Sequence, residues 1–492
     1  MNYKMMGRLN ALILTVVTIF MLPALFISLY YGEYRTVYSF AATMGIMLAV
    51  AGLLALFSRN AKKDFYAREG IVCVGMSWII MSVFSCLPFV FSGAIPNYFD
   101  ALFEIVSGYT TTGASIIRDL TPIPKGILYW RSFTHWLGGM GVLVFLLAIV
   151  PVGGKNEGFT MHLLRAESPG PDVGKIVPRM KQTAMVLYIS YLALTVLCLL
   201  TLLFGNIFLE QDIPVFDAFC ITFGTAGTGG FGVRNDSIAS YTPYVQWVVT
   251  VFMLLFGVNF SCYYLLLLRK IKSVLRDEEL RLYLCLVAVS TTLIVVNLLS
   301  SASVDLSTSD AIREAAFHVS SIITTTGFSV SDYNLWPTFS KTIIVILMCI
   351  GASAGSTGGG FKCARVLLLF KSLRRNLSQV LRPQKVKVIR VNGKVVAEKI
   401  LSNTASYLFI YVFIIALSTL LISIDGFSIE TNFTAVLACF NNIGPGLDAV
   451  GPVSNFADYS IFSKLILTIN MLAGRLEIFP IILLFKAEAW KR

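Results

Sequence analysis

Long apolar runs without a charged residue limit what this chain can fold into. An α-helix needs about 20 consecutive apolar residues to cross a bilayer, and these uncharged runs reach or pass that length: 9–32, 36–58, 70–99, 132–154, 182–209, 237–268, 282–304, 342–361 and 401–424. Only 13% of the residues are charged, about half the share of a soluble domain. The sequence therefore predicts an all-α polytopic membrane protein and excludes a soluble one.

Basic residues gather in particular loops between these runs. The net charge of +12 comes largely from Lys and Arg at 59–68, 155–181, 269–281 and 371–399. Such clusters mark cytoplasmic loops, so we expect both termini inside and the charge to indicate topology, with no nucleic acid as partner. The first run is too long for a signal peptide and lacks a cleavage site, so we expect it to remain as a span.

Residue patterns of catalysis are absent from the sequence. The nine cysteines are scattered through apolar runs without C-x-x-C spacing, and the histidines His135, His162 and His318 lie far apart. Neither H-E-x-x-H nor G-x-S-x-G occurs. We therefore expect no enzyme activity.

The loops that lack a basic cluster are expected to face outward, and they contain an internal repeat. Three copies open on an acidic residue followed by Ala and reach a glycine 13 residues later, in a Thr- or Gly-rich turn: Asp100 to Gly113, Asp217 to Gly230 and Glu314 to Gly327. A fourth copy, Asn441 to Gly446, aligns by spacing alone. We expect the three acids to cap the N-termini of short half-helices, because they start the stretches.

Each copy lies between two long apolar runs. This order predicts four pseudo-repeated units of span, pore helix and span around a central pore, with two extra N-terminal transmembrane helices. The expected divisions are an N-terminal two-helix segment (1–69), pore repeats 1 and 2 (70–154 and 155–275), pore repeat 3 with a Gly-rich intramembrane loop (276–375), a cytosolic basic linker with a hairpin (376–400) and pore repeat 4 (401–492).

Extended backbone at membrane depth is tolerated only where protein or a water-filled path surrounds it. Four such turns around one axis form a ring of carbonyls that can replace the hydration shell of a monovalent cation, and Gly suits positions with positive φ. Either Gly229 or Gly230 can be the counterpart in the second copy. The candidate ion-binding residues are Thr111, Thr112, Gly113, Gly229, Gly230, Thr325, Thr326, Gly327, Asn442, Ile443 and Gly444.

The four turns resemble those of the Trk/Ktr/HKT superfamily of cation transporters: T-T-T-G-A-S at 110–115, G-T-G-G-F at 227–231, T-T-T-G-F-S at 324–329 and N-N-I-G-P-G-L at 441–447. Two additional N-terminal spans and the stretches 351–362 and 471–477 narrow this to the bacterial Trk-type, TrkH-like, potassium-uptake membrane subunits. The resemblance implies potassium as the transported ion, no organic cofactor, and a homodimer in the bacterial inner membrane with one potassium-selective pore per subunit. It also implies gating by a cytosolic RCK-type nucleotide-binding subunit, TrkA-like.

Many small residues interrupt the run 342–361, where each Gly costs a helix about 1 kcal/mol. A phosphate-binding loop is excluded, because the G-K-[ST] ending is missing. The family resemblance implies an intramembrane gate beneath the ring of carbonyls, which would act as the selectivity filter. A tightly packed helix crossing is the alternative. The gate residues are then Gly351, Gly355, Ser356, Thr357, Gly358, Gly359 and Gly360.

Arg475 lies in the last apolar span, where a charge normally faces the interior or a water-filled cavity. We expect it to line the pore as a charge barrier near the gate, and a structural salt bridge with another helix is the alternative. Glu477 is a poor partner, because residues two apart do not share a helix face.

Two further patterns bear on function. Residues 386–396 alternate apolar and polar side chains around Asn392-Gly393, which predicts a β-hairpin. It is too short to be stable alone, so we expect it to lean on a partner. Besides a pore, a Na⁺- or H⁺-coupled symporter of alternating-access type remains open.

Overall fold

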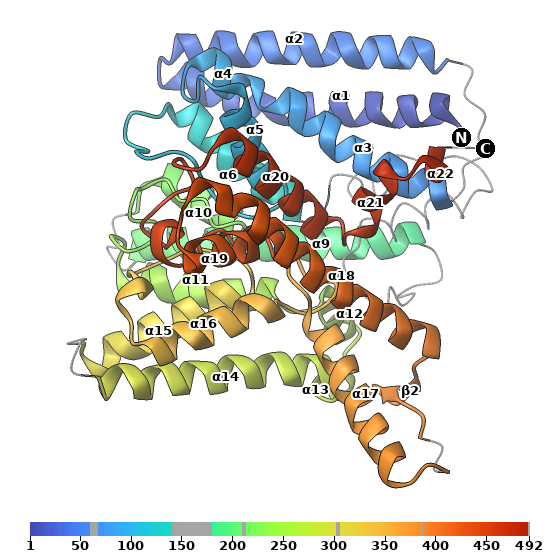
Figure 1. The fold of residues 1–492 in the computed structure, drawn as a ribbon. Coiled ribbons are helices and arrows are strands. Elements are labelled where there is room, and N and C mark those ends of the chain that lie inside the picture. The colour runs from blue at the N-terminus through green and yellow to red at the C-terminus, as the bar shows by residue number, and fades with distance from the viewer. Residues whose placement is uncertain are drawn as a thin grey trace.

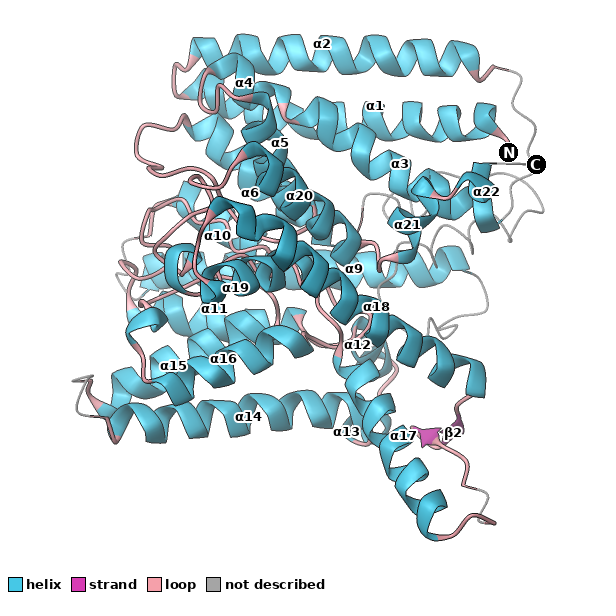
Figure 2. Cartoon of the chain, in the orientation of Figure 1, coloured by secondary structure: helices cyan, strands magenta, loops and turns pink. Residues whose placement is uncertain are grey.

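The computed structural model describes residues 1–59, 67–139, 141, 180–208, 213–301, 306–384 and 387–490. Within these residues the chain is helical, with one two-stranded sheet (Figures 1 and 2). In this part of the chain, 6 helical segments are long and apolar enough to cross a bilayer, and a bent pair can form another. The predicted all-α polytopic fold is confirmed.

Four units with one order of elements follow the N-terminal pair α1 (Tyr3–Tyr30) and α2 (Tyr34–Phe57). Each contains a long helix, a short half-helix and a returning helix. Unit 1 has α3 (Ala67–Ser85), extended by α4 (Leu87–Ser92), then α5 (Tyr98–Tyr109) and α6 (Lys125–Gly139); unit 2 has α9 (Met180–Phe208), α10 (Val215–Gly227) and α11 (Pro243–Phe256); unit 3 has α14 (Glu278–Leu299), α15 (Thr308–Ile323) and α16 (Thr338–Ile350); unit 4 has α18 (Glu398–Ile422), α19 (Ile429–Phe440) and α20 (Ile461–Arg475).

The half-helices are too short to cross a bilayer. They contain 12, 13, 16 and 12 residues, and an α-helix rises about 1.5 Å per residue against a hydrocarbon core of about 30 Å. Each half-helix therefore ends within the membrane, surrounded by the longer helices.

Returning helices in three units are broken, so the runs 237–268 and 342–361 are not single straight spans. An 87° bend separates α11 from α12 (Phe260–Leu267), and the Asn259 side chain caps α12 there. Residues between α16 and α17 (Cys363–Leu381) are not helical, and α20 stops before α21 (Phe479–Phe485) at two residues with positive φ, Glu477 and Ile478. The run 132–154 extends beyond the described residues.

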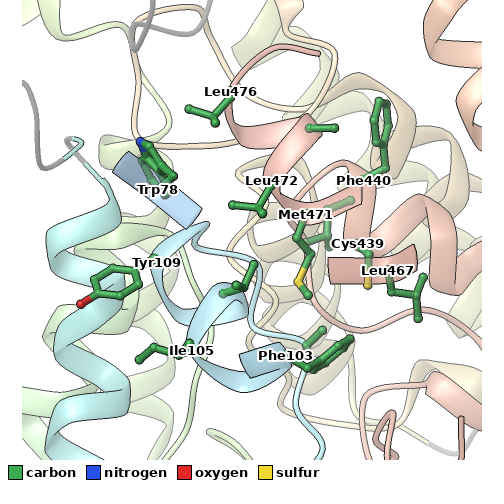
Figure 3. Close-up of a cluster of buried hydrophobic side chains, with 14 of the residues drawn as sticks. Trp78, Phe103, Ile105, Tyr109, Cys439, Phe440, Leu467, Met471, Leu472 and Leu476 are labelled. Atoms are coloured by element: carbon green, nitrogen blue, oxygen red, sulfur yellow. The ribbon is translucent and has the colours of Figure 1, made fainter. Parts of the chain in front are cut away.

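Unit 1 packs against unit 4, which closes the units into a circle. Buried side chains from α3, α5, α19 and α20 meet in one cluster (Figure 3): Trp78, Phe103, Ile105, Tyr109, Cys439, Phe440, Leu467, Met471, Leu472 and Leu476. The Lys464 ammonium group on α20 also lies 2.8 Å from the Asp100 carboxylate on α5. Helices more than 300 residues apart in the sequence are thus direct neighbours.

Acidic residues occupy the first turns of two half-helices but cap neither, so the expected capping role is wrong: Asn97 caps α5, and among the described residues no side chain caps α10. Asp100 and Asp217 lie in the first turns of α5 and α10. The expectation for Glu314 is wrong, because α15 begins at Thr308, is capped by Ser307 and carries Asp310 in its first turn. Glu314 instead accepts a hydrogen bond from the Ser331 hydroxyl, 2.7 Å away.

The predicted hairpin is confirmed in the described residues, and its support comes from the same chain. Strands β1 (Arg390–Val391) and β2 (Lys394–Val395) pair antiparallel around Asn392 and Gly393, both with positive φ. The Asn392 amide donates to Asp277 (2.6 Å), and its backbone N–H donates to Glu278 (3.2 Å) at the start of α14. Ile389 is buried between α17 and α18.

The N-terminal pair is fastened to unit 1 through a helix cap. Glu33, in the turn between α1 and α2, accepts hydrogen bonds from the backbone N–H groups of Lys125 (2.5 Å) and Gly126 (3.1 Å) at the start of α6. These groups have no partner within their own helix, and the carboxylate also suits the positive end of the helix dipole.

Replacing this cap should loosen unit 1. We expect Glu33→Ala to lower stability by about 1 kcal/mol, since both N–H groups lose their acceptor, with a lower thermal unfolding midpoint in detergent. Glu33→Gln keeps one acceptor oxygen and should lie between the two. Equal midpoints for wild type and Glu33→Ala would contradict the assignment.

Candidate ion pathway

Every half-helix ends in the same turn. The first residue of each turn is left-handed, with φ of 55°, 54°, 57° and 55°: Thr111, Thr228, Thr325 and Asn442. The next residue donates its N–H to the carbonyl five positions earlier, at 2.7–2.9 Å: Thr112 to Ser107, Gly229 to Gly224, Thr326 to Ser321, and Ile443 to Ala438. This is the Schellman ending, in which the left-handed residue is usually Gly. Thr in that conformation is strained, and the repeated strain indicates a functional site.

The glycine after each turn forms a closed ring with its neighbours. Gly113, Gly230, Gly327 and Gly444 have φ of 81°, 78°, 84° and 99°. A Cβ atom at each would press on a carbonyl oxygen of the next unit: Gly113 on Gly229, Gly230 on Thr326, Gly327 on Ile443, and Gly444 on Thr112. The ring therefore runs through all four units and back to the first. It identifies Gly230 as the counterpart in unit 2.

Gly229 must lack a side chain for a different reason. A Cβ atom there would overlap the imidazole of His135 on α6. The imidazole is fully buried, with Nδ1 2.8 Å from the Gly108 carbonyl and Nε2 3.3 Å from the Phe231 N–H, which donates to it. Gly229 thus admits the side chain that links the ends of α5 and α10.

A cavity opens on the side of the ring where the chain leaves the turns. All four ring glycines line it, together with Arg118, Arg131 and Arg234. Each of these arginines is paired with a carboxylate: Arg118 with Asp458, Arg131 with Glu104, and Arg234 with Asp217. The pairing lowers the repulsion that a cation would meet at this mouth.

The Gly-rich loop lies against the other side of the ring. Residues 351–362 lie between helices, so the alternative of a packed helix crossing is wrong. Gly359 donates its N–H to the Thr325 hydroxyl (2.6 Å). A Cβ atom would come within 2.8 Å of the Thr324 carbonyl from Gly358, and within 2.5 Å of the Asn441 carbonyl from Gly359. The loop consists mostly of residues with small side chains because it fits closely beneath the turns of units 3 and 4.

Arg475 joins this loop to unit 1. Its guanidinium group donates to the carbonyls of Thr357 in the loop (2.8 Å) and of Gly139 (2.8 Å) and Gly138 at the end of α6. Arg475 is 6% exposed. Glu477 pairs with Arg365 on α17, as expected of a poor partner for Arg475.

The sequence analysis did not identify one buried ion pair, between Glu104 in the middle of α5 and Arg131 in α6. Charged residues within otherwise apolar stretches were the available signal. Gly138 and Gly139, three and four residues after His135, have packing roles, because a Cβ atom would meet the Tyr109 carbonyl from Gly138 and Gly227 from Gly139.

Comparisons with known proteins agree with this architecture. A family model for TrkH, described as a cation transport protein, matches residues 38–491. The Trk system potassium uptake protein TrkH of Escherichia coli is 35% identical over 466 residues, which are 92% of this chain and 92% of that protein. The TrkG protein of the same organism is 32% identical over 476 residues, 96% and 95% of the two chains.

A solved structure matches the whole chain. The crystal structure of the potassium transporter TrkH from Vibrio parahaemolyticus superposes with a TM-score of 0.85 at 29% identity and covers 100% of both chains. These relatives are transporters, which confirms the expectation that the chain is not an enzyme. The chain belongs to the TrkH family of cation transport proteins.

Proposed function

We propose that this chain takes up potassium through a pore in the bacterial inner membrane. The closed ring of four glycine turns carries the proposal, because each of four equivalent carbonyls, those of Thr112, Gly229, Thr326 and Ile443, lies against the ring glycine of a neighbouring unit. Carbonyl rings of this kind substitute for the water around a monovalent cation. The potassium uptake proteins among the relatives support potassium as the ion.

The Gly-rich loop and Arg475 form the gate in this proposal. The loop lies directly under the turns of units 3 and 4, and Arg475 ties it to unit 1 across the path. A loop held by hydrogen bonds to carbonyls can move aside without unfolding a helix. A coupled symporter is disfavoured, because the four units share one order and close into a ring.

The cytosolic side receives a regulatory partner in this proposal. The proposal assigns both termini to the inside, with the hairpin and the basic residues of 371–399. The hairpin presents Lys394 and Val395 to solvent, which suits strand addition by an RCK-type nucleotide-binding subunit. The family resemblance also implies a homodimer, and an exposed apolar stripe on α17 offers a surface for it: Phe370, Leu373, Leu377, Val380 and Leu381.

Rubidium uptake tests the pore. We expect the chain to restore uptake in potassium-starved cells lacking their own systems, and the purified protein to admit potassium over sodium in liposomes. Gly113→Ser should lower that preference, since its side chain displaces the Gly229 carbonyl. Gly52→Ser, in open space on α2, is the matched control. Equal potassium-to-sodium ratios for wild type and Gly113→Ser would refute the filter.

Two substitutions of Arg475 test the gate. Arg475→Ala should raise potassium flux in liposomes, because it releases Thr357 from the end of α6. Arg475→Lys keeps the charge but loses the planar fork that spans several carbonyls. If Arg475→Lys also raises the flux, the hydrogen bonds of the guanidinium group keep the gate closed. If the flux of Arg475→Lys stays low, the positive charge is the barrier. Unchanged flux in both folded variants contradicts the gate.

Substitutions on the exposed strand test the regulatory partner. We expect Lys394→Glu combined with Val395→Glu to abolish co-purification of the nucleotide-binding subunit while insertion stays normal, because the contacts of Asn392 with α14 remain. Lys399→Glu, exposed outside the strands, controls for charge. Retained co-purification and an unaltered nucleotide response would rule out docking at the hairpin.

A further inference from the structure

A buried ion pair within unit 1 lies beside the ring and contacts unit 2. The Glu104 carboxylate on α5 is 0% exposed, and Arg131 on α6 is 3% exposed. Arg131 Nε donates to Glu104 Oε1 at 2.5 Å. Removing two charges from water costs several kcal/mol each, so a buried pair is a weak source of stability. Its place in the fold suggests a different role.

Both partners also hold the backbone that leaves the turns. Glu104 accepts hydrogen bonds from the Ile116 N–H and the Ser115 hydroxyl, both at 2.9 Å, just after Gly113. Arg131 donates to the Gly232 carbonyl at 3.0 Å, just after Gly230. Its guanidinium carbon also lies 3.5 Å from the centre of the Phe231 ring. The pair thus connects the exit from turn 1 to the exit from turn 2.

At the other three junctions between units, neutral hydrogen bonds connect the segments that follow the turns. Between units 2 and 3 the Ile238 N–H donates to the Ser329 carbonyl (3.0 Å), and between units 3 and 4 the Tyr333 hydroxyl donates to the Gly446 carbonyl (3.0 Å). Between units 4 and 1 the Phe456 N–H donates to the Ser115 carbonyl (2.8 Å). Ion pairs also join units 4 and 1, Lys464 with Asp100 and Arg118 with Asp458, and the Glu104–Arg131 pair is the most deeply buried of these three.

We propose that the Glu104–Arg131 pair is a positioning device for cation selectivity. It fixes the turn of unit 1 against the turn of unit 2, and so sets the separation between the Thr112 and Gly229 carbonyls, without touching the ion. Selectivity by a carbonyl ring depends on where its oxygens are held. The inference rests on the proposed potassium pore, and it adds residues outside the ring that determine which monovalent cation passes.

The potassium-to-sodium permeability ratio of purified protein in liposomes tests this role. Arg131→Lys keeps a charge beside Glu104 but cannot also reach Gly232 in a planar fork. Glu104→Gln combined with Arg131→Gln removes both charges together and leaves no unpaired ion. We expect a severalfold fall in the ratio for both variants. Asp100 lies on the same half-helix as Glu104 and pairs with Lys464 on α20. Asp100→Asn breaks that pair and should keep the wild-type ratio.

A second measurement covers variants that fail to accumulate. Phe231→Leu leaves both charges paired and removes only the ring under Arg131, and we expect a smaller fall in the ratio. Variants that unfold at lower temperature but keep the wild-type ratio would overturn the proposal and leave the pair a structural role. A wild-type protein without potassium preference would instead refute the proposed function.

Discussion

Backbone N–H and C=O groups need hydrogen-bond partners wherever water is absent, and the centre of this protein is built around that requirement. Four half-helices stop inside the membrane, and each Schellman turn satisfies its own last carbonyls. The turns then lie so close together that a ring glycine of one unit touches a carbonyl of the next. In the proposed pore, these carbonyls are the groups that contact the ion.

The support around the ring differs between its two faces. On the cavity side, the exits from the turns are joined by direct hydrogen bonds and by the Glu104–Arg131 pair. On the other side, the Gly-rich loop donates to the Thr325 hydroxyl, and Arg475 donates to the Thr111 hydroxyl and to the Thr357 carbonyl of the loop. One face is therefore joined by direct contacts between neighbouring units, while the other is covered by a loop without helix or strand, which hydrogen bonds with Gly257, Glu279 and Arg475 hold in place. In the proposed pore, this loop is the element that moves when an ion passes.

The sequence predicts the spans, the repeat and the turns, because each follows from a local rule: apolar length for the spans, and positive φ at fixed spacing for the glycines. It could not place Glu314, since the start of α15 depends on Ser307, several residues earlier, and makes this half-helix longer than the others. The bend after α11 and the joining of Arg131 to Gly232 also escaped, because both depend on contacts between distant segments. The choice between Gly229 and Gly230 needed the contact of Gly230 with the Thr326 carbonyl of unit 3.

All four turns belong to one polypeptide, and this has a consequence for how such a pore can change. In an assembly of four identical chains, a point mutation would alter every position of the ring at once. Here it alters one quarter of the ring, so the free energy of ion binding can be adjusted in smaller steps. Unit 4 already shows such independent variation, with Asn442 and Ile443 where unit 3 has Thr325 and Thr326. A single polypeptide thus gives each side of the ring its own mutational history.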